Sequence, residues 1–177
     1  MPNPVQQSPP LRRPYASQYV ALWRLKDGTA VTIRPIRPED ESMAVDFYQK
    51  LSDRSVYLRY FRSKQADKAA LHEYLKPICC VDYNREMVLV AMYENRISSH
   101  DEMIAGARLV NLHGSSEAEC AIIVADGYHN RGLGTELCRR LLEIARVEAV
   151  QRVTCAILPG NVTMCTICSR FGFDLEF

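Results

Sequence analysis

The chain has 177 residues, of which 47% are hydrophobic and 24% are charged, a length and composition typical of one globular domain with a full core. Its 22 Lys and Arg residues nearly balance its 21 Asp and Glu residues, so the net charge of +1 excludes a general electrostatic field for nucleic acid or an anionic membrane. No apolar run is long enough to span a bilayer and the first residues do not resemble a signal peptide, so we expect a cytoplasmic protein.

The seven cysteines are an odd number, and most of them fall within apolar strand or helix patterns. We therefore predict reduced core residues. Cys165 and Cys168 have the spacing of a metal or redox pair, but no second pair and no nearby His accompany them. We expect no metal site.

Five prolines within residues 1–14 predict a flexible arm over residues 1–18, followed by one domain over residues 19–177. Trp23–Leu25 and Val31–Arg34 are predicted strands of a hairpin with Asp27-Gly28 at the turn. Pro38 is predicted to begin a helix that extends to Leu51.

A second helix is predicted over Val56–Phe61. The cations around it favour a solvated face over an anion-binding patch: Arg54, Arg59, Arg62 and Lys64.

The next segments predict a short helix followed by a mixed sheet. The helix is Ala69–Leu75, ended by Pro77. Met87–Tyr93 and Met103–Val110 are predicted strands of a long antiparallel hairpin. The last two predicted strands are Ala118–Val124 and Val153–Leu158, and a helix that ends near Glu148 lies between them. This order requires a right-handed crossover connection, so the two strands are parallel. The predicted class is α/β (α+β).

One stretch, Tyr128–Thr135, lies between an apolar strand and a strongly periodic helix. Its glycines, Gly132 and Gly134, let a ligand approach the main chain at a helix start, whose free N–H groups attract anions. The Gly-x-Gly spacing matches neither the dinucleotide fingerprint nor the phosphate loop of nucleotide triphosphatases. On the glycines alone, an anion site and a plain tight connection both remain open.

Arg131-Gly132-Leu133-Gly134-Thr135 resembles the acetyl-CoA motif of the GNAT acetyltransferase superfamily, and Asn161 followed by Phe171-Gly172-Phe173 resembles its second landmark. Three N-terminal segments narrow the match, because they resemble the Pat-type protein lysine acetyltransferases: Leu25–Thr29, Ile33–Asp40 and Ser52–Phe61. The resemblance implies the GNAT fold, a mixed twisted sheet with helices on both faces and a splayed parallel strand pair. Many members are fused to an acyl-CoA-synthetase-like region.

The resemblance also implies which residues hold acetyl-CoA. The loop amides would hold its pyrophosphate, and a main-chain N–H near Ile123 or Val124 would hold the thioester oxygen. Asn161 would bond the pantetheine amides, cap its own helix, or do both. The implied set is Ile122, Ile123, Val124, His129, Asn130, Arg131, Gly132, Leu133, Gly134, Thr135 and Asn161.

The acceptor amine needs a base, and Glu119 is our candidate because it shares a strand face with Ala121 and Ile123. Apolar neighbours would raise its pKa toward the range that suits a base. The alternative is a solvent-facing Glu, with Glu117 as the reserve candidate. Many members of the resembling superfamily carry, at the position of Cys168, a Tyr that protonates the departing CoA thiolate. In this chain we expect either the Cys168 thiol or water to protonate it.

We therefore expect acetyl transfer to lysine Nε-amines by direct attack in a ternary complex. The acceptor would be a protein with an exposed lysine, an acyl-CoA synthetase among the candidates. The alternatives are a small-molecule amine acetyltransferase and a CoA-sensing module without catalysis. Phe173–Phe177 are too short for the final hairpin that the resemblance implies, so we expect either a second chain, as in a dimer, at the uncovered sheet edge, or a trimmed and less stable domain.

Overall fold

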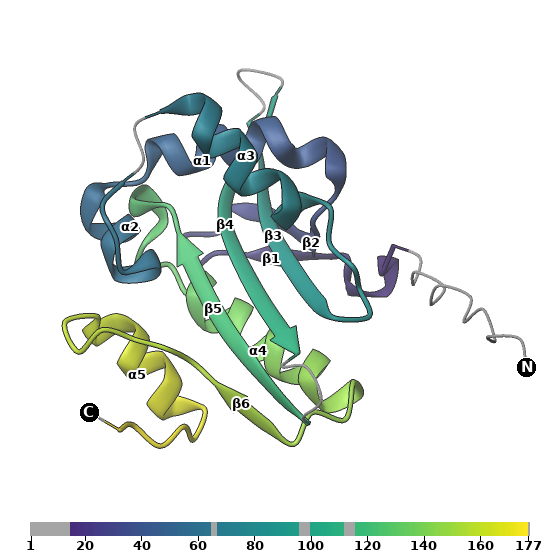
Figure 1. The fold of residues 1–177 in the computed structure, drawn as a ribbon, viewed down its shortest axis with the longest axis vertical. Helices are drawn as coiled ribbons and strands as arrows, with labels where there is room; N and C mark the ends of the chain where they lie inside the picture. Colours follow the sequence, from purple (N-terminus) through teal and green to yellow (C-terminus); the bar gives the residue numbers. More distant parts are fainter. Residues whose placement is uncertain (1–14, 65–66, 96–99, 112–115, 177) are drawn as a thin grey trace, which may run out of the picture.

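A six-stranded sheet with strands in sequence order organises the computed structural model, which describes residues 15–64, 67–95, 100–111 and 116–176 (Figure 1). All neighbouring strands are antiparallel except β5 and β6, which are parallel. The predicted mixed sheet is confirmed. The strands are β1 (Ala21–Arg24), β2 (Ala30–Pro35), β3 (Glu86–Asn95), β4 (His100–Asn111), β5 (Glu117–Val124) and β6 (Arg152–Thr154).

Helices cover both faces of the sheet, as predicted (Figure 1). One core contains apolar residues of the first three helices, packed on β3 and β4 from one side. The other core contains the apolar face of α4, packed on β2 to β5 from the opposite side. The helices are α1 (Glu41–Lys50), α2 (Asp53–Tyr60), α3 (Lys68–Cys79), α4 (Leu133–Val147) and α5 (Val162–Arg170).

Helix α4 follows from its sequence period. The residues at helical spacing that the sequence singled out are all buried: Leu133, Leu137, Leu141, Ile144 and Ala145. Glu136 is also buried, and its carboxylate accepts hydrogen bonds at 2.7–2.8 Å from Arg139 and Arg140. Burial alone would raise the pKa of Glu136, but the bonds from these two arginines outweigh it and lower the pKa.

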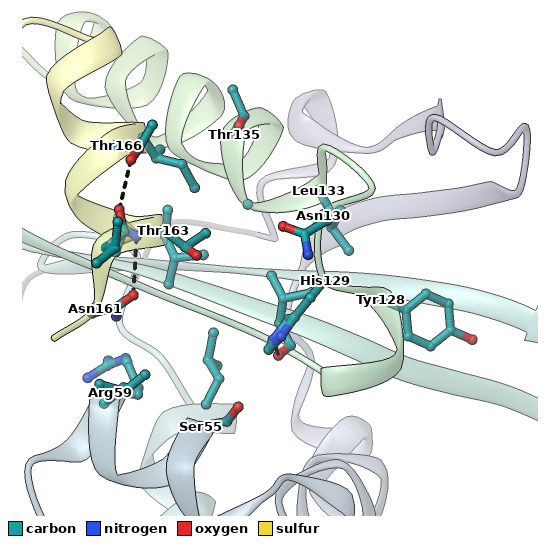
Figure 2. Close-up of a pocket in the computed structure, with 18 of the residues that line it drawn as sticks. Ser55, Arg59, Tyr128, His129, Asn130, Leu133, Thr135, Asn161, Thr163 and Thr166 are labelled. Atoms are coloured by element: carbon teal, nitrogen blue, oxygen red, sulfur yellow. Dashed lines mark hydrogen bonds between the residues drawn. The ribbon is translucent and has the colours of Figure 1, made fainter.

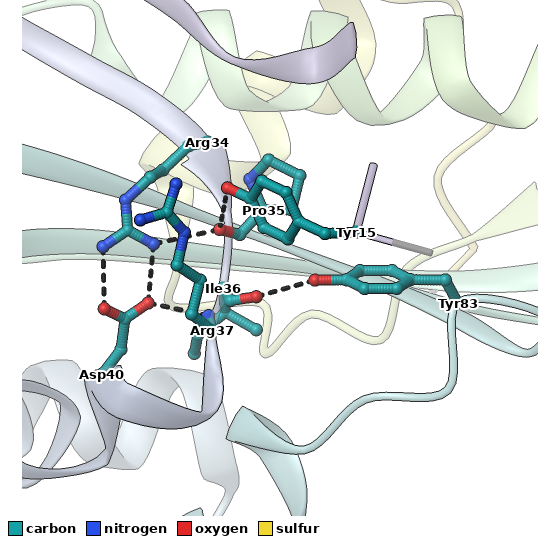
Figure 3. Close-up of polar contacts among 7 residues, drawn as sticks. All are labelled: Tyr15, Arg34, Pro35, Ile36, Arg37, Asp40 and Tyr83. Carbon is teal, nitrogen blue, oxygen red and sulfur yellow. Dashed lines mark hydrogen bonds and ion pairs between the residues drawn. The ribbon is translucent and has the colours of Figure 1, made fainter. Parts of the chain in front are cut away.

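The turn from β2 into α1 is fixed by a buried ion pair (Figure 3). Both guanidinium Nη atoms of Arg34 donate to the Asp40 carboxylate, at 2.6 and 2.7 Å, and Asp40 also accepts from the Arg37 N–H at 2.8 Å. The hydroxyls of Tyr15 and Tyr83 bond carbonyl oxygens of the same turn. This network sets the direction in which α1, and α2 after it, leave the sheet.

Strands β5 and β6 pair over three residues and then separate. The register runs from Glu117–Arg152 to Glu119–Thr154. The predicted strand Val153–Leu158 was therefore wrong at its end, because from Cys155 onward the chain no longer has a neighbouring strand to bond. Residues 173–176 form no strand either, which leaves β6 at the edge of the described sheet.

Two further sequence predictions need correction. Helix α3 extends through Pro77 to Cys79, because Pro77 lies in the last turn and the Cys80 N–H still bonds the Lys76 carbonyl. The central hairpin is longer at both ends than predicted. Residues 1–14 of the predicted arm lie outside the described residues, and of its last residues Ala16 is buried while Ser17 and Gln18 are exposed, so the bounds of the arm stay a prediction. No described helix has the length and apolar character needed to cross a bilayer.

Candidate functional site

The connection from β5 to α4 turns sharply at two left-handed residues, Asn130 at φ 60° and Gly132 at φ 87°. Gly132 is the N-cap of α4, and a residue without Cβ adopts this φ at no steric cost. The first helical bond joins the Glu136 N–H to the Gly132 carbonyl at 3.1 Å. The N–H groups just ahead of it have no carbonyl one turn earlier, so they form a donor set at the positive end of the helix.

A cavity of about 660 Å³ lies in front of these donors (Figure 2). Its walls are the end of β5 with the glycine loop, the start of α5, and one side of α2. Four cations border it, and Asp126 is the single carboxylate among its lining residues: the cations are Lys26, Arg54, Arg59 and Arg170. A positive lining beside free helix N–H groups suits a ligand that carries phosphates.

The structure brings together all of the sequence-predicted cofactor residues except Arg131. Those that line the cavity are Ile122, Ile123, Val124, His129, Asn130, Gly132, Leu133, Gly134, Thr135 and Asn161. Contact of each with a ligand stays a prediction.

Arg131 instead pairs with the hairpin turn between β1 and β2. Its Nη1 donates to the Asp27 carboxylate at 2.7 Å, and its guanidinium lies 5.2 Å from the centre of the Tyr128 ring. Its carbonyl also accepts from the Lys26 N–H at 3.1 Å. The Arg131 side chain therefore holds the loop in place from outside the cavity.

Gly134 marks the closest approach between the loop and α5. A Cβ built there would lie 3.3 Å from Cδ1 of Ile167, tighter than most such contacts. Because the Ile167 side chain also lines the cavity, a side chain at this position would narrow it.

Asn161 begins α5 and faces the cavity. Its side-chain oxygen accepts from the Met164 N–H at 3.1 Å, so the predicted capping role is confirmed (Figure 2). The side-chain amide group of a capping Asn keeps its two N–H donors for other partners. A role toward pantetheine stays a prediction.

His129 fixes the end of β5. Its Nε2 lies 2.9 Å from the Val124 carbonyl oxygen. A carbonyl only accepts, so Nε2 carries the proton and donates it, and in the neutral ring Nδ1 remains an acceptor. The imidazole thus holds the strand at the point where the chain turns into the loop.

A second cavity, of about 80 Å³, meets the first one at the end of β5. Ile123 and Arg59 border both cavities. Apolar residues of the sheet form its floor, and aromatic residues of α1 to α3 form its opposite wall, among them Phe47, Tyr48, Tyr60 and Tyr74. The two cavities are thus neighbours beside Ile123.

The predicted base, Glu119, lies at the last residue of β5 that pairs with β6. It is exposed and borders neither cavity. The expectation that apolar neighbours surround its carboxylate was therefore wrong. Its strand face does continue into the small cavity, since Ala121 and Ile123 line that cavity. The reserve candidate, Glu117, lies two residues earlier, with Arg152 at 3.7 Å.

Cys168 is fully buried and lies outside the lining of both cavities. The Cys155 thiol beside it, together with burial, raises the pKa of Cys168 far above its usual range. Cys120 also lies within hydrogen-bonding reach of Cys155, so sulfurs of β5, of the segment that follows β6 and of α5 converge in the core. Such protonated thiols are unreactive. Across the described ranges, no cluster of three or more His, Cys, Asp or Glu side chains could hold a metal ion.

Sequence reasoning missed the α2 wall of the cavity. Ser55, Leu58 and Arg59 line it at positions three and four apart, which places them on one helix face. That helical spacing could have indicated a wall of the cavity, but the mixture of cationic and acidic residues in this segment favoured a solvated helix face. Lys26 and Arg170 also line the cavity, but they lie far from the glycine loop in the sequence, and no sequence pattern indicated that they border it.

Three features occur together at this site: a glycine loop that leads into a helix, a neighbouring pair of parallel strands that separate, and a cationic cavity. Together they define the class of acyltransferases that take their acyl group from coenzyme A. The family model for the acetyltransferase (GNAT) domain matches residues 30–174. The chain therefore belongs to the GNAT acetyltransferase family, whose members use acetyl-CoA.

Named relatives support this membership. An acetyltransferase of Pseudomonas aeruginosa is 29% identical over 150 residues, which cover 84% of this chain and 77% of the relative. Acetyltransferase Pat of Mycolicibacterium smegmatis is 33% identical over 84% of this chain, but this chain spans only 43% of that protein. The crystal structure of the GNAT domain of S. lividans PAT superposes with a TM-score of 0.78 at 25% identity, covering 93% of each chain.

Proposed function

We propose that the chain transfers the acetyl group of acetyl-CoA to the Nε-amine of a lysine in a protein substrate. The observation that carries this proposal is the meeting of two unlike cavities at Ile123. The large cationic one suits the phosphates and pantetheine of CoA, and the small aromatic one suits a slender aliphatic amine. Similarity to proteins named Pat supports the protein acceptor.

The residues of the large cavity fit acetyl-CoA. The free N–H groups at the start of α4 would bond its pyrophosphate, and Lys26, Arg54 and Arg170 of the lining would neutralise its phosphates. The absence of a Cβ at Gly134 leaves room between the loop and Ile167 for the chain of the ligand. Asn161 would offer its amide N–H groups to the pantetheine.

The pairing of β5 supports one main-chain donor for the thioester oxygen over the other. The Ala125 N–H bonds the Ile104 carbonyl of β4, so by alternation the N–H of Ile123 also points to β4. The N–H groups of Val124 and Ile122 then point to the opposite side, which β6 has left. Val124, whose carbonyl is held by His129, is the pre-organised donor that polarises the thioester.

Glu119 would serve as the base through water. A lysine has a pKa of about 10.4, so it must lose a proton before it attacks. Glu119 lies four positions before Ile123 along the strand, about 13 Å away, a distance that a chain of several waters can span and a side chain cannot. The amine nitrogen forms the new bond to the acetyl carbon, and its proton passes to the Glu119 carboxylate. The carbon–sulfur bond breaks with its electron pair on sulfur, which takes a proton from water.

Glu119→Gln tests this assignment. We expect kcat for a lysine peptide to fall by about 10²–10⁴-fold, while calorimetry finds an unchanged Kd for acetyl-CoA. Glu117→Gln is the comparator on the same strand face, and Glu39→Gln is an exposed control. Full activity in Glu119→Gln with loss in Glu117→Gln would move the role to Glu117. Transfer to free polyamines but to no lysine peptide would overturn the protein acceptor.

A further inference from the structure

Three tyrosines form a continuous aromatic wall on the acceptor side of the small cavity. The ring centres of Tyr48 and Tyr60 lie 5.8 Å apart, and those of Tyr60 and Tyr74 lie 6.1 Å apart. Burial raises the pKa of Tyr60 to about 12, so its hydroxyl stays neutral. The wall can contact the aliphatic stem of an acceptor, but it provides no anionic group for the ammonium.

Two arginines stack on this wall. The Arg59 guanidinium lies 4.9 Å from the centre of the Tyr60 ring, and that of Arg62 lies 4.4 Å from the centre of the Tyr74 ring. Stacking on aromatic faces holds a guanidinium in place and leaves its N–H edge free for an anion. Both charges are therefore positioned before any substrate arrives.

Within the described part of the chain, no carboxylate neutralises these charges. Among the described residues, no carboxylate lines the small cavity, and no carboxylate forms an ion pair with Arg59 or Arg62. The other arginine of the cavity, Arg108, differs because its Nε donates to Glu86 at 2.7 Å. The acceptor mouth thus carries unpaired positive charge, which repels an acceptor whose amine is surrounded by further cations.

Two exposed aromatic side chains lie on α2 and at its C-terminal end. Phe61 ends α2 at φ 58°, a left-handed conformation that is costly for a bulky residue, and its side chain remains 47% exposed. Tyr57, one turn earlier, is 53% exposed. A glycine would end the helix at lower cost.

We propose that the acceptor amine carries a carboxylate beside it, so that the preferred substrate is a lysine flanked by Asp or Glu, with the carboxylate held by Arg59 and Arg62. This inference rests on the proposed function, because it assigns the substrate class of the same acceptor cavity. A small amine with its own carboxylate has the same chemistry, and the experiment separates the two sources.

The test compares three lysine peptides of equal length with acidic, alanine or basic residues flanking the lysine. We expect kcat/KM about 10-fold higher for the acidic peptide than for the alanine peptide at low salt, and a smaller difference at high salt. Arg62→Glu should abolish or reverse this preference and leave the Kd for acetyl-CoA unchanged, since Arg62 borders neither cavity. Arg146→Glu, on the exposed side of α4, is the matched charge-reversal control and should preserve it.

A parallel pair of small acceptors, aminohexanoate and hexanediamine, identifies the source of the carboxylate. Preference for aminohexanoate without peptide transfer supports the carboxylate and overturns the protein acceptor. Equal kcat/KM for all three peptides overturns the inference and leaves the proposed function standing. Transfer to none of the acceptors, with acetyl-CoA still bound, overturns both.

Discussion

The Asp126 carboxylate joins the cofactor loop to α2 through Ser52. The Ser52 N–H donates to Oδ2 at 2.9 Å and its hydroxyl donates to Oδ1 at 2.6 Å, and Ser55 adds a third bond at 2.8 Å. Ser52 is also the N-cap of α2, since its hydroxyl accepts from the Ser55 N–H. One carboxylate on the loop therefore orders the start of the helix that forms the opposite wall of the large cavity.

Asp126→Ala should loosen this wall. We expect the free energy of unfolding to fall by about 1 kcal/mol, the low end for bonds to a charged acceptor because the site is exposed. The Kd for acetyl-CoA should rise several-fold, because the α2 residues of the cavity lose their fixed position. Thermal unfolding and calorimetry measure the two effects. Asp46→Asn, at an exposed position of α1, is the control, and equal behaviour of the two variants would contradict the role of Asp126.

The same carboxylate predicts a pH dependence. Burial would raise the pKa of Asp126, but hydrogen bonds from Ser52 and Ser55 outweigh it and lower the pKa to about 2. Because the folded pKa lies below the unfolded value of about 3.9, this contribution to stability is complete above pH 4 and is lost as the pH falls toward 2. The stability difference between the native chain and Asp126→Asn should shrink over that range in urea unfolding. A constant difference from pH 5 to pH 2 would refute the linkage.

The glycines of the loop should respond differently to a single methyl group. Gly132→Ala forces a Cβ onto φ 87°, which costs about 1–2 kcal/mol of folding stability. Gly134→Ala should have a smaller effect on stability but should weaken acetyl-CoA binding, because its Cβ presses on Ile167. Gly127→Ala is the control, since a Cβ there meets nothing within 4 Å. Melting temperature and acetyl-CoA titration separate these cases, and similar losses in all three would contradict the assignment.

The features that the sequence predicted correctly are formed by residues that lie close together in the chain. The strand before the loop, the glycines and the apolar period of α4 lie within one continuous stretch, so residue spacing predicted these elements, and the family resemblance was needed to predict an anion site there. The α2 wall depends on Asp126 meeting Ser52 across 74 residues, and the side chain of Arg131 depends on Asp27 across 104 residues. The early end of β6 depends on the separation of two strands. Such tertiary relationships leave no periodic pattern in the sequence.

Variants of Arg131 test whether its side chain contacts acetyl-CoA directly or supports binding only by holding the loop in place. If its side chain only ties the loop to the β1–β2 turn, then Arg131→Gln and Asp27→Asn should weaken acetyl-CoA binding to a similar extent, about 2–3-fold, as expected for loss of a half-exposed ion pair. A double variant should be no worse than either single one. If Arg131 contacted the phosphates, Asp27→Asn would free it and strengthen binding. Calorimetric titration of the three variants distinguishes these outcomes.

Cys168→Ala separates a structural thiol from an acid catalyst. The buried thiol packs against Cys155, and its raised pKa keeps it protonated. We expect a stability loss of about 1 kcal/mol from the small cavity that the substitution leaves, with kcat and its pH profile unchanged. Cys165→Ala, on the same helix but partly exposed, is the control. A large fall in kcat in Cys168→Ala, with loss of the alkaline limb of the pH profile, would show that the thiol protonates the departing CoA after all.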